Sequence, residues 1–103
     1  MNDPKISVIM GIYQSKNKDM VRKAIQSIID QTFTEWEFVI CDDGSPDDTW
    51  EFLNKEYGKD ERFVLVRNEQ NGGLRVALNS CLKAASAEYV VRMDADDYSR
   101  PDR

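Results

Sequence analysis

The chain has 103 residues and a net charge of −5, from 19 acidic and 14 basic side chains, and it contains no histidine. The length suits one small domain with a single hydrophobic core. The negative charge disfavours a nucleic-acid-binding protein, which needs a basic face to replace phosphate counterions. The absence of histidine excludes Ser-His-Asp catalysis, His-ligated zinc sites and imidazole general bases within this chain. Any chemistry must therefore come from carboxylates, basic side chains, backbone dipoles or a metal ion.

The first part of the chain predicts one strand and one helix. A β-branched run at residues 6–10 is typical of a buried strand, and Gly11 is expected to end it. Apolar residues at three- and four-residue spacing then predict an amphipathic helix over residues 19–31, with Asn17 or Asp19 as its N-cap.

A second strand and a second helix follow. Residues 37–41 form an apolar run that stops at the turn-forming sequence Asp-Asp-Gly-Ser-Pro of residues 42–46. A helix is expected over residues 49–57, because Asp48 and Glu51 have the spacing of a capping box.

The last third repeats the alternation. Residues 62–67 predict a third strand, and the glycines at 72–73 open a helix whose apolar stripe runs over residues 74–85. Residues 89–93 predict a fourth strand, and Pro101 marks the first turn of a further helix.

The order of elements predicts one α/β domain over residues 1–103, with a Rossmann-like three-layer α/β/α arrangement and a mostly parallel sheet. Continuous apolar strands favour a sheet that is covered on both faces. In such sheets ligands bind beyond the carboxyl ends of the strands, near the point where the strand order reverses.

The cysteines and the N-terminal residues give indications of where in the cell the protein is located. Cys41 and Cys81 fall within apolar patterns, so we expect both to be reduced core residues. The first five residues lack the pattern of a signal peptide, and the longest apolar run, residues 6–13, is far shorter than the roughly 20 residues of a membrane helix. These features predict a cytoplasmic protein.

Two acidic clusters follow predicted strands and are the strongest candidates for chemistry. Carboxylates gathered at one edge of a sheet repel each other unless a cation or a hydrogen-bonding ligand lies between them. Oxygen ligands without histidine or cysteine favour Mg²⁺ or Mn²⁺ over zinc. The seven acids are Asp42, Asp43, Asp47, Asp48, Asp94, Asp96 and Asp97.

A simpler interpretation stays open for both clusters. Aspartates next to glycine and proline are common turn and cap residues, and we expect Asp47 and Asp48 to be caps and not ligands. Three acids within residues 94–97, directly after a buried strand, favour a ligand role more strongly.

The order and spacing of five segments closely resemble the N-terminal part of family-2 glycosyltransferases with the GT-A fold. These segments are residues 7–13, 31–45 with their QTF and DDGS sequences, 71–75, 93–97 and 101–103. The resemblance implies transfer of a sugar from a nucleoside diphosphate sugar, with UDP-sugars favoured, to a carbohydrate or lipid-linked acceptor. It also implies inversion at the anomeric carbon and a divalent metal, Mn²⁺ or Mg²⁺.

The resemblance assigns roles to single residues. Tyr13 matches the aromatic side chain that packs on the nucleobase, and Asp43, with Asp42 beside it, matches the acid that accepts a hydrogen bond from the base. Arg75 matches a basic residue near the phosphates, behind two glycines whose N–H groups favour anions. Without the resemblance, a half-buried boundary tyrosine and a solvated helix arginine are equally good interpretations of Tyr13 and Arg75.

The aspartates after the fourth strand match the family's DxD motif. The resemblance assigns Asp94 to the ribose and the metal-bound diphosphate, Asp96 to the metal as its more direct ligand, and Asp97 to a share of that task. The general base that deprotonates the acceptor is expected beyond Arg103, so the chain is expected to hold only the donor-binding half of an active site, inactive alone.

Two other classes of protein remain as alternatives. Sugar nucleotidyltransferases share a related layout but usually carry a glycine-rich basic loop after the first strand, and residues 11–18 hold one glycine and no arginine. A non-catalytic nucleotide-binding fragment is the third possibility. The strand at residues 89–93 is expected to present a free apolar edge, which predicts self-association through that edge.

Overall fold

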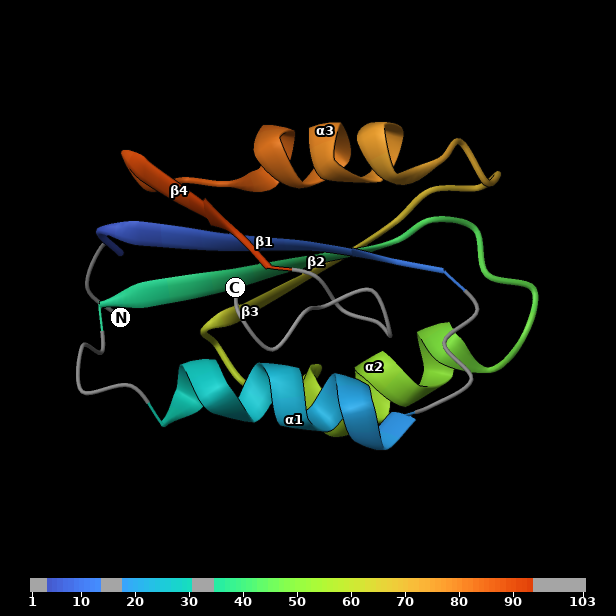
Figure 1. The fold of residues 1–103 in the computed structure, drawn as a ribbon, viewed down its shortest axis with the longest axis horizontal. Coiled ribbons are helices and arrows are strands. Elements are labelled where there is room, and N and C mark those ends of the chain that lie inside the picture. Colours follow the sequence, from blue (N-terminus) through green and yellow to red (C-terminus); the bar gives the residue numbers. More distant parts are fainter. Residues whose placement is uncertain (1–3, 14–17, 31–34, 94–103) are drawn as a thin grey trace.

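The computed structural model describes residues 4–13, 18–30 and 35–93. All four strands of this part are parallel, in the order β3-β2-β1-β4 (Figure 1). The predicted α/β class with a mostly parallel sheet is therefore confirmed. The elements are β1 (Ile6–Ile12), α1 (Lys18–Ile29), β2 (Trp36–Asp42), α2 (Thr49–Tyr57), β3 (Phe63–Arg67), α3 (Leu74–Ala84) and β4 (Tyr89–Arg92).

Helices α1 and α2 cover one face of the sheet and α3 covers the other (Figure 1). The chain proceeds from β1 to β2 to β3 and then returns through α3 to the far side of β1. Because βαβ crossovers are right-handed, this reversal sends α3 to the opposite face. The strand order reverses between β1 and β4, so parallel-sheet architecture favours a ligand at the carboxyl edge near these strands.

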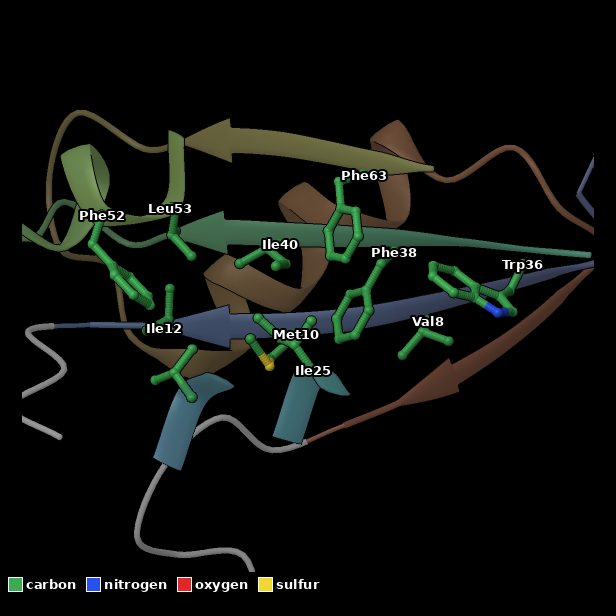
Figure 2. Packing of buried hydrophobic residues seen from close by; sticks show 11 residues of the cluster. Val8, Met10, Ile12, Ile25, Trp36, Phe38, Ile40, Phe52, Leu53 and Phe63 are labelled. Atoms are coloured by element: carbon green, nitrogen blue, oxygen red, sulfur yellow. The ribbon is translucent and has the colours of Figure 1, made fainter. Parts of the chain in front are cut away.

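The larger core lies between the sheet and helices α1 and α2 (Figure 2). The rings of Phe38 and Phe63 stack there with their centroids 5.5 Å apart, and Trp36 contacts both rings edge-on. The smaller core lies under α3, where Ala77 and Cys81 pack against β1 and β2. Apolar contacts on both faces of the sheet thus hold it between the helices.

Gly11 lies inside β1, whereas the sequence predicts that the strand stops before it. The reason is the close approach of α3: a Cβ atom at Gly11 would lie 3.0 Å from Cβ of Ala77 and 3.1 Å from Cδ1 of Leu74. A glycine allows the helix to cross the strand here. Strand β1 therefore continues to Ile12 and carries Tyr13 out to the carboxyl edge.

The predicted apolar stripe of α3 is only partly buried, because Leu74 and Leu82 are about half exposed. Strand β4 is exposed at all four positions, so among the described residues the expectation of a sheet covered on both faces fails at this strand. Within the part of the chain that the structure describes, β4 lies at the edge of the sheet, as predicted, with Tyr89, Val90 and Val91 exposed. No helix among the described residues has the length and apolar character needed to cross a membrane.

Cys41 and Cys81 are free and fully buried, as predicted. They belong to the smaller core, between β2 and α3. A hydrogen bond with Cys81 and burial together raise the pKa of the Cys41 thiol. This thiol therefore stays protonated at neutral pH and acts as a small apolar side chain.

Candidate functional site

Three segments converge at the carboxyl edge of the sheet. Strand β1 ends at Ile12, β2 at Asp42 and β3 at Arg67. In the register of the sheet, Asp42 pairs with Ile12 on one side and with Arg67 on the other. Beyond the strands, N–H of Asp43 donates to O of Ile12 (2.9 Å), and N–H of Asn68 donates to O of Asp42 (2.9 Å). These bonds fix the backbone from which the predicted site residues project.

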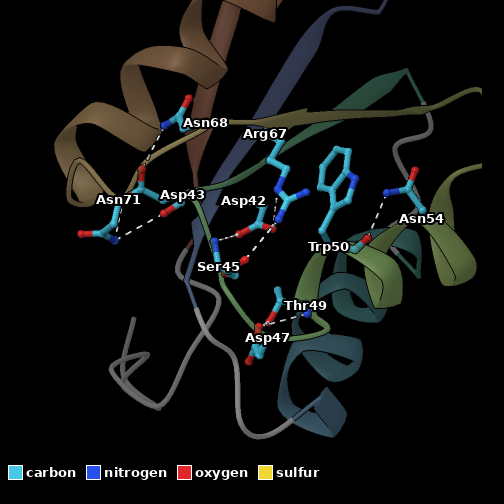
Figure 3. A network of polar contacts seen from close by, with 10 residues as sticks. All are labelled: Asp42, Asp43, Ser45, Asp47, Thr49, Trp50, Asn54, Arg67, Asn68 and Asn71. Atoms are coloured by element: carbon cyan, nitrogen blue, oxygen red, sulfur yellow. Dashed lines mark hydrogen bonds and ion pairs between the residues drawn. The ribbon is translucent and has the colours of Figure 1, made fainter.

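The turn after β2 is shaped by its own aspartates (Figure 3). Asp42 Oδ1 accepts a hydrogen bond from N–H of Ser45 (3.0 Å). Gly44 has φ of +74°, and a Cβ atom there would lie 2.7 Å from the backbone N of Asn71. Only glycine fits both the left-handed conformation and the contact with the neighbouring loop. The 42–46 turn thus packs directly against the loop that precedes α3.

The cap roles predicted for Asp47 and Asp48 differ from the contacts that the structure shows. Asp48 occupies the N-cap position of α2 without a side-chain cap bond, and its carboxylate instead pairs with Nζ of Lys18 (3.2 Å). Asp47 Oδ1 accepts from N–H (3.1 Å) and Oγ1–H (2.6 Å) of Thr49. Burial raises the pKa of Asp47, but the bonds from Thr49 together with the charge of Lys18 and a backbone bond of Asp47 hold that pKa below its usual range.

Asp43 is 2% exposed and is surrounded by donors from the loop before α3 (Figure 3). Its Oδ1 accepts from Nδ2 of Asn68 (2.9 Å) and from N–H of Gly72 (3.1 Å). Its Oδ2 accepts from N–H of Gly73 (2.8 Å), from Nδ2 of Asn71 (3.1 Å) and from N–H of Gly72 (3.2 Å). The protein itself satisfies this carboxylate.

This arrangement corrects the expectation that the two glycines before α3 favour an external anion. Their N–H groups do bind an anion, but that anion is the carboxylate of Asp43. Asp43 is thus neutralised by donors of the chain itself. The positive end of α3 and the negative turn after β2 neutralise each other.

Arg67 lies beside the fully buried carboxylate of Asp42 (Figure 3). Its Nε is 3.9 Å from Asp42 Oδ2, an oxygen that accepts no hydrogen bond from the described residues. Its Nη2 donates to O of Ser45 (3.2 Å), and its guanidinium lies over the ring of Trp50 at 5.7 Å from the centroid. Arg67 therefore supplies the positive charge that faces Asp42 and ties β3 to the turn after β2.

Two predicted site residues stay exposed at this edge. Tyr13 is 44% exposed directly after β1, and Arg75 is exposed in the first turn of α3. Asp94, Asp96 and Asp97 lie outside the described residues. Within residues 4–13, 18–30 and 35–93, no three acidic or thiol side chains come together as a metal site.

Sequence reasoning missed Arg67, Asn68 and Asn71. A usable signal existed for Arg67, because it ends β3 and parallel pairing brings strand ends together. The two asparagines had no such signal, since asparagine is common in turns and their partner Asp43 is more than twenty positions away.

Comparisons with known proteins agree with this architecture. The family model described as glycosyl transferase family 2 matches residues 7–103. EpsE of Bacillus subtilis (strain 168), named as a glycosyltransferase, is 40% identical over 102 residues, covering 97% of this chain and 36% of EpsE. WfaP of Escherichia coli, named as a UDP-Glc:α-D-GlcNAc-diphosphoundecaprenol β-1,3-glucosyltransferase, is 38% identical over 93 residues, covering 90% of this chain and 36% of WfaP. The chain thus spans about a third of the length of these curated relatives.

A solved structure gives a similar picture. S. aureus TarS 1–349 in complex with UDP-GlcNAc matches with a TM-score of 0.77 and 34% identity, covering 91% of this chain and 27% of that chain.

Proposed function

Because the chain belongs to glycosyltransferase family 2, we propose that it forms the donor-binding part of an enzyme that transfers a sugar from a nucleoside diphosphate sugar to an acceptor hydroxyl. The observation that carries the proposal is the carboxyl edge near the strand-order reversal, where exposed Tyr13 follows β1 and exposed Arg75 lies in the first turn of α3. The likeness to TarS bound to UDP-GlcNAc supports a UDP-sugar as donor. Family membership favours this function over that of a sugar nucleotidyltransferase.

Each exposed side chain has a chemical role in this proposal. The ring of Tyr13 stacks on the nucleobase, which offers a flat polarisable face. The guanidinium of Arg75 attracts the diphosphate and stabilises its charge as it departs. Asp94 binds the ribose, and Asp43, with Asp42 beside it, accepts a hydrogen bond from the base.

A divalent ion fits the remaining donor set. Asp94, Asp96 and Asp97 would hold it through carboxylate oxygens, the ligand type that Mn²⁺ and Mg²⁺ take. A bound ion would supply positive charge against the leaving diphosphate. The reaction we propose is a direct displacement: the acceptor oxygen forms a bond to the anomeric carbon while the bond to the diphosphate breaks, which inverts that centre, and a general base takes the proton of the acceptor hydroxyl.

Calorimetric titration with UDP and Mn²⁺ tests the donor site. We expect Tyr13→Ala and Arg75→Ala each to weaken UDP binding about tenfold, since stacking on one base contributes about 1–3 kcal/mol and a hydrogen bond to a charged group about 1.5–3 kcal/mol. The matched controls are Tyr89→Ala on β4 and Lys83→Ala on the exposed side of α3, and both should bind as the unaltered chain does. A folded chain that binds no nucleotide with or without metal would refute the proposal.

We also propose a cytoplasmic location. The free thiols of Cys41 and Cys81 support it, because reducing compartments keep such thiols unpaired. Cell fractionation tests it, and recovery of the protein outside the cytoplasm would contradict it.

Self-association along β4 is a further part of the proposal. Residues Tyr89, Val90 and Val91 are 65%, 42% and 48% exposed on a strand that lies at the sheet edge among the described residues. Antiparallel pairing of two copies about Val90 would set Glu88 of one opposite Arg92 of the other, so opposite charges meet at both ends. Light scattering should detect a dimer that Val90→Lys abolishes and Val76→Lys, on α3, does not. A monomer at high concentration would overturn it.

A further inference from the structure

We propose that Asn68 is a positioning residue of the nucleotide site: its side-chain amide, held by Ser80, fixes the carboxylate of Asp43 in the orientation from which it accepts the N–H of the base. The inference rests on the proposed function, because it concerns the bond between Asp43 and the nucleobase of the donor. Asn68 acts through Asp43 and does not itself touch the nucleotide. Asn71, which donates to the same carboxylate, is the contact that the base replaces.

Asn68 connects the carboxylate to the middle of α3. Its Nδ2 donates to Oδ1 of Asp43 (2.9 Å; Figure 3). Its Oδ1 accepts from Oγ–H of Ser80 (2.8 Å). An amide has a donor end and an acceptor end, and here each end has a partner of the matching kind. Reversing the amide would bring its oxygen against the negative charge of Asp43, so the hydroxyl and the carboxylate both hold it in one orientation.

Both residues of this connection lie on regular structure. The backbone N–H of Asn68 donates to O of Asp42 (2.9 Å), which ties the residue directly after β3 to the end of β2. Ser80 directly precedes Cys81, a fully buried residue of α3 that belongs to the core between the helix and the sheet. Asn68 is therefore in place before any ligand binds, and preorganised groups bind a ligand more tightly than mobile ones.

Asn71 contacts the same carboxylate in a different way. It is exposed, and its Nδ2 is shared between Oδ2 (3.1 Å) and the backbone O (3.4 Å) of Asp43. The N–H groups of Gly72 and Gly73 also donate to the carboxylate, but they cannot turn away without moving the start of α3. Because Asp43 is only 2% exposed, a base reaches it where a covering side chain turns aside. Asn71 is the donor that can do so and bond to water instead.

The orientation of the carboxylate matters because the position of the base is already restricted. N–H of Asp43 donates to O of Ile12 (2.9 Å), the residue directly before Tyr13. A base that stacks on Tyr13 presents its N–H in one direction only. Hydrogen bonds prefer angles above about 150° and weaken steeply below about 120°. A carboxylate that turned freely would therefore lose much of its bond to the base.

Affinities for UDP and CDP in the presence of Mn²⁺ test the inference in the 103-residue chain. Uracil has an imide N–H at the ring position where cytosine has an acceptor, so the ratio of the two affinities reports the bond to Asp43. A residue that only stabilised the loop would change both affinities equally. The variants are Asn68→Ala, Ser80→Ala and Asn71→Ala, with Asn79→Ala on the exposed side of α3 as the matched control.

We expect Asn68→Ala to weaken UDP binding about five- to tenfold and CDP binding less than about twofold, because UDP alone uses the oriented acceptor. Ser80→Ala should weaken UDP binding selectively by about two- to threefold, since the amide stays but is free to turn. Asn71→Ala should strengthen UDP binding by about two- to threefold, because the base no longer displaces an amide. Asn79→Ala should change neither affinity.

Equal weakening of UDP and CDP binding by Asn68→Ala would overturn the inference. A loss of UDP affinity in Asn71→Ala as large as that in Asn68→Ala would also overturn it, because any donor to the carboxylate would then have the same effect. Ser80→Ala keeps the asparagine, so its selectivity for UDP decides the matter if Asn68→Ala fails to fold.

Hydrogen exchange at the side-chain amide of Asn68, followed by NMR, tests the positioning without a ligand. Exchange should be slow in the unaltered chain and about tenfold faster in Ser80→Ala. Fast exchange in the unaltered chain would overturn the positioning role whether or not a nucleotide binds. If exchange is slow and the unaltered chain binds neither UDP nor CDP, the proposed function fails while the hold of Asn68 on Asp43 stands.

Discussion

Glu37 is a buried carboxylate at the amino end of the sheet, opposite the edge that carries the candidate site. Its Oε2 accepts hydrogen bonds from Oγ–H of Ser7 (2.5 Å) and from N–H (2.6 Å) and Oγ–H (3.0 Å) of Ser86. Oγ of Ser7 in turn accepts from N–H of Ala87 (3.0 Å). These bonds hold the connection between α3 and β4 against β1 and β2.

We expect Glu37→Ala to lower the free energy of unfolding by about 3 kcal/mol. A hydrogen bond to a charged group contributes about 1.5–3 kcal/mol, and a buried donor left without an acceptor costs about 1–3 kcal/mol. The hydroxyl of Ser7 is fully buried, so losing its acceptor carries that cost, whereas Ser86 is exposed and can donate to water instead. Removing the carboxylate also removes its own desolvation, which keeps the loss below the simple sum.

Urea unfolding followed by tryptophan fluorescence measures this loss, with Glu61→Ala on an exposed turn as the control. Ser7→Ala and Glu37→Ala should be non-additive, with a coupling above about 0.5 kcal/mol, because they remove the same bond. UDP affinity should not change, since the cluster lies at the other end of the sheet. A loss below about 1 kcal/mol, or full additivity of the two changes, would refute this account of the network.

Three further predictions concern the turns and the site. Gly44→Ala should lower the free energy of unfolding by about 2 kcal/mol or more, because of its φ of +74° and the 2.7 Å approach to the neighbouring loop; an unchanged urea midpoint would contradict this. Hydrogen bonds from Arg62 hold the pKa of Asp60 below its usual range against burial. That stabilisation is present above the unfolded-state pKa and is lost as the pH falls through the folded-state value. Asp60→Asn should therefore destabilise the chain at about pH 7 but not at about pH 2, and equal losses at both would count against it. Arg67→Ala should cost about 1–2 kcal/mol in urea unfolding, because it removes the cation 3.9 Å from the buried carboxylate of Asp42; a neutral result would exclude that pairing as a source of stability.

The elements could be predicted because the signals that define them are local. Helix α2 has the predicted bounds, Thr49–Tyr57, since the turn before it and the residues of its first turn lie next to each other in the sequence. The end of β1 could not be predicted in the same way. Gly11 is normally a strand terminator, and what keeps it within the strand is Ala77 on a helix 66 positions later.

The exposure of β4 could not be predicted from its composition either. Tyr89, Val90 and Val91 are the residues of a buried parallel strand, yet all three are exposed. Composition indicates which side chains favour burial, but whether a strand is buried depends on which helices pack against it. Helix α3 packs chiefly on β1 and β2, so β4 lies beyond the area it covers.

The site illustrates a limit of motif reasoning that follows from parallel-sheet geometry. Acidic residues after β2 predict a cation, and a glycine pair before α3 predicts an anion, when each is considered alone. The fold brings both segments to the same edge, and there Asp43 is the anion for Gly72 and Gly73. Complementary motifs at one edge should therefore be paired with each other before an external ligand is assigned to either. Among the described residues, Tyr13 and Arg75 stay exposed at this edge, and an aromatic ring and a cation are the groups that the proposed binding of a nucleoside diphosphate uses.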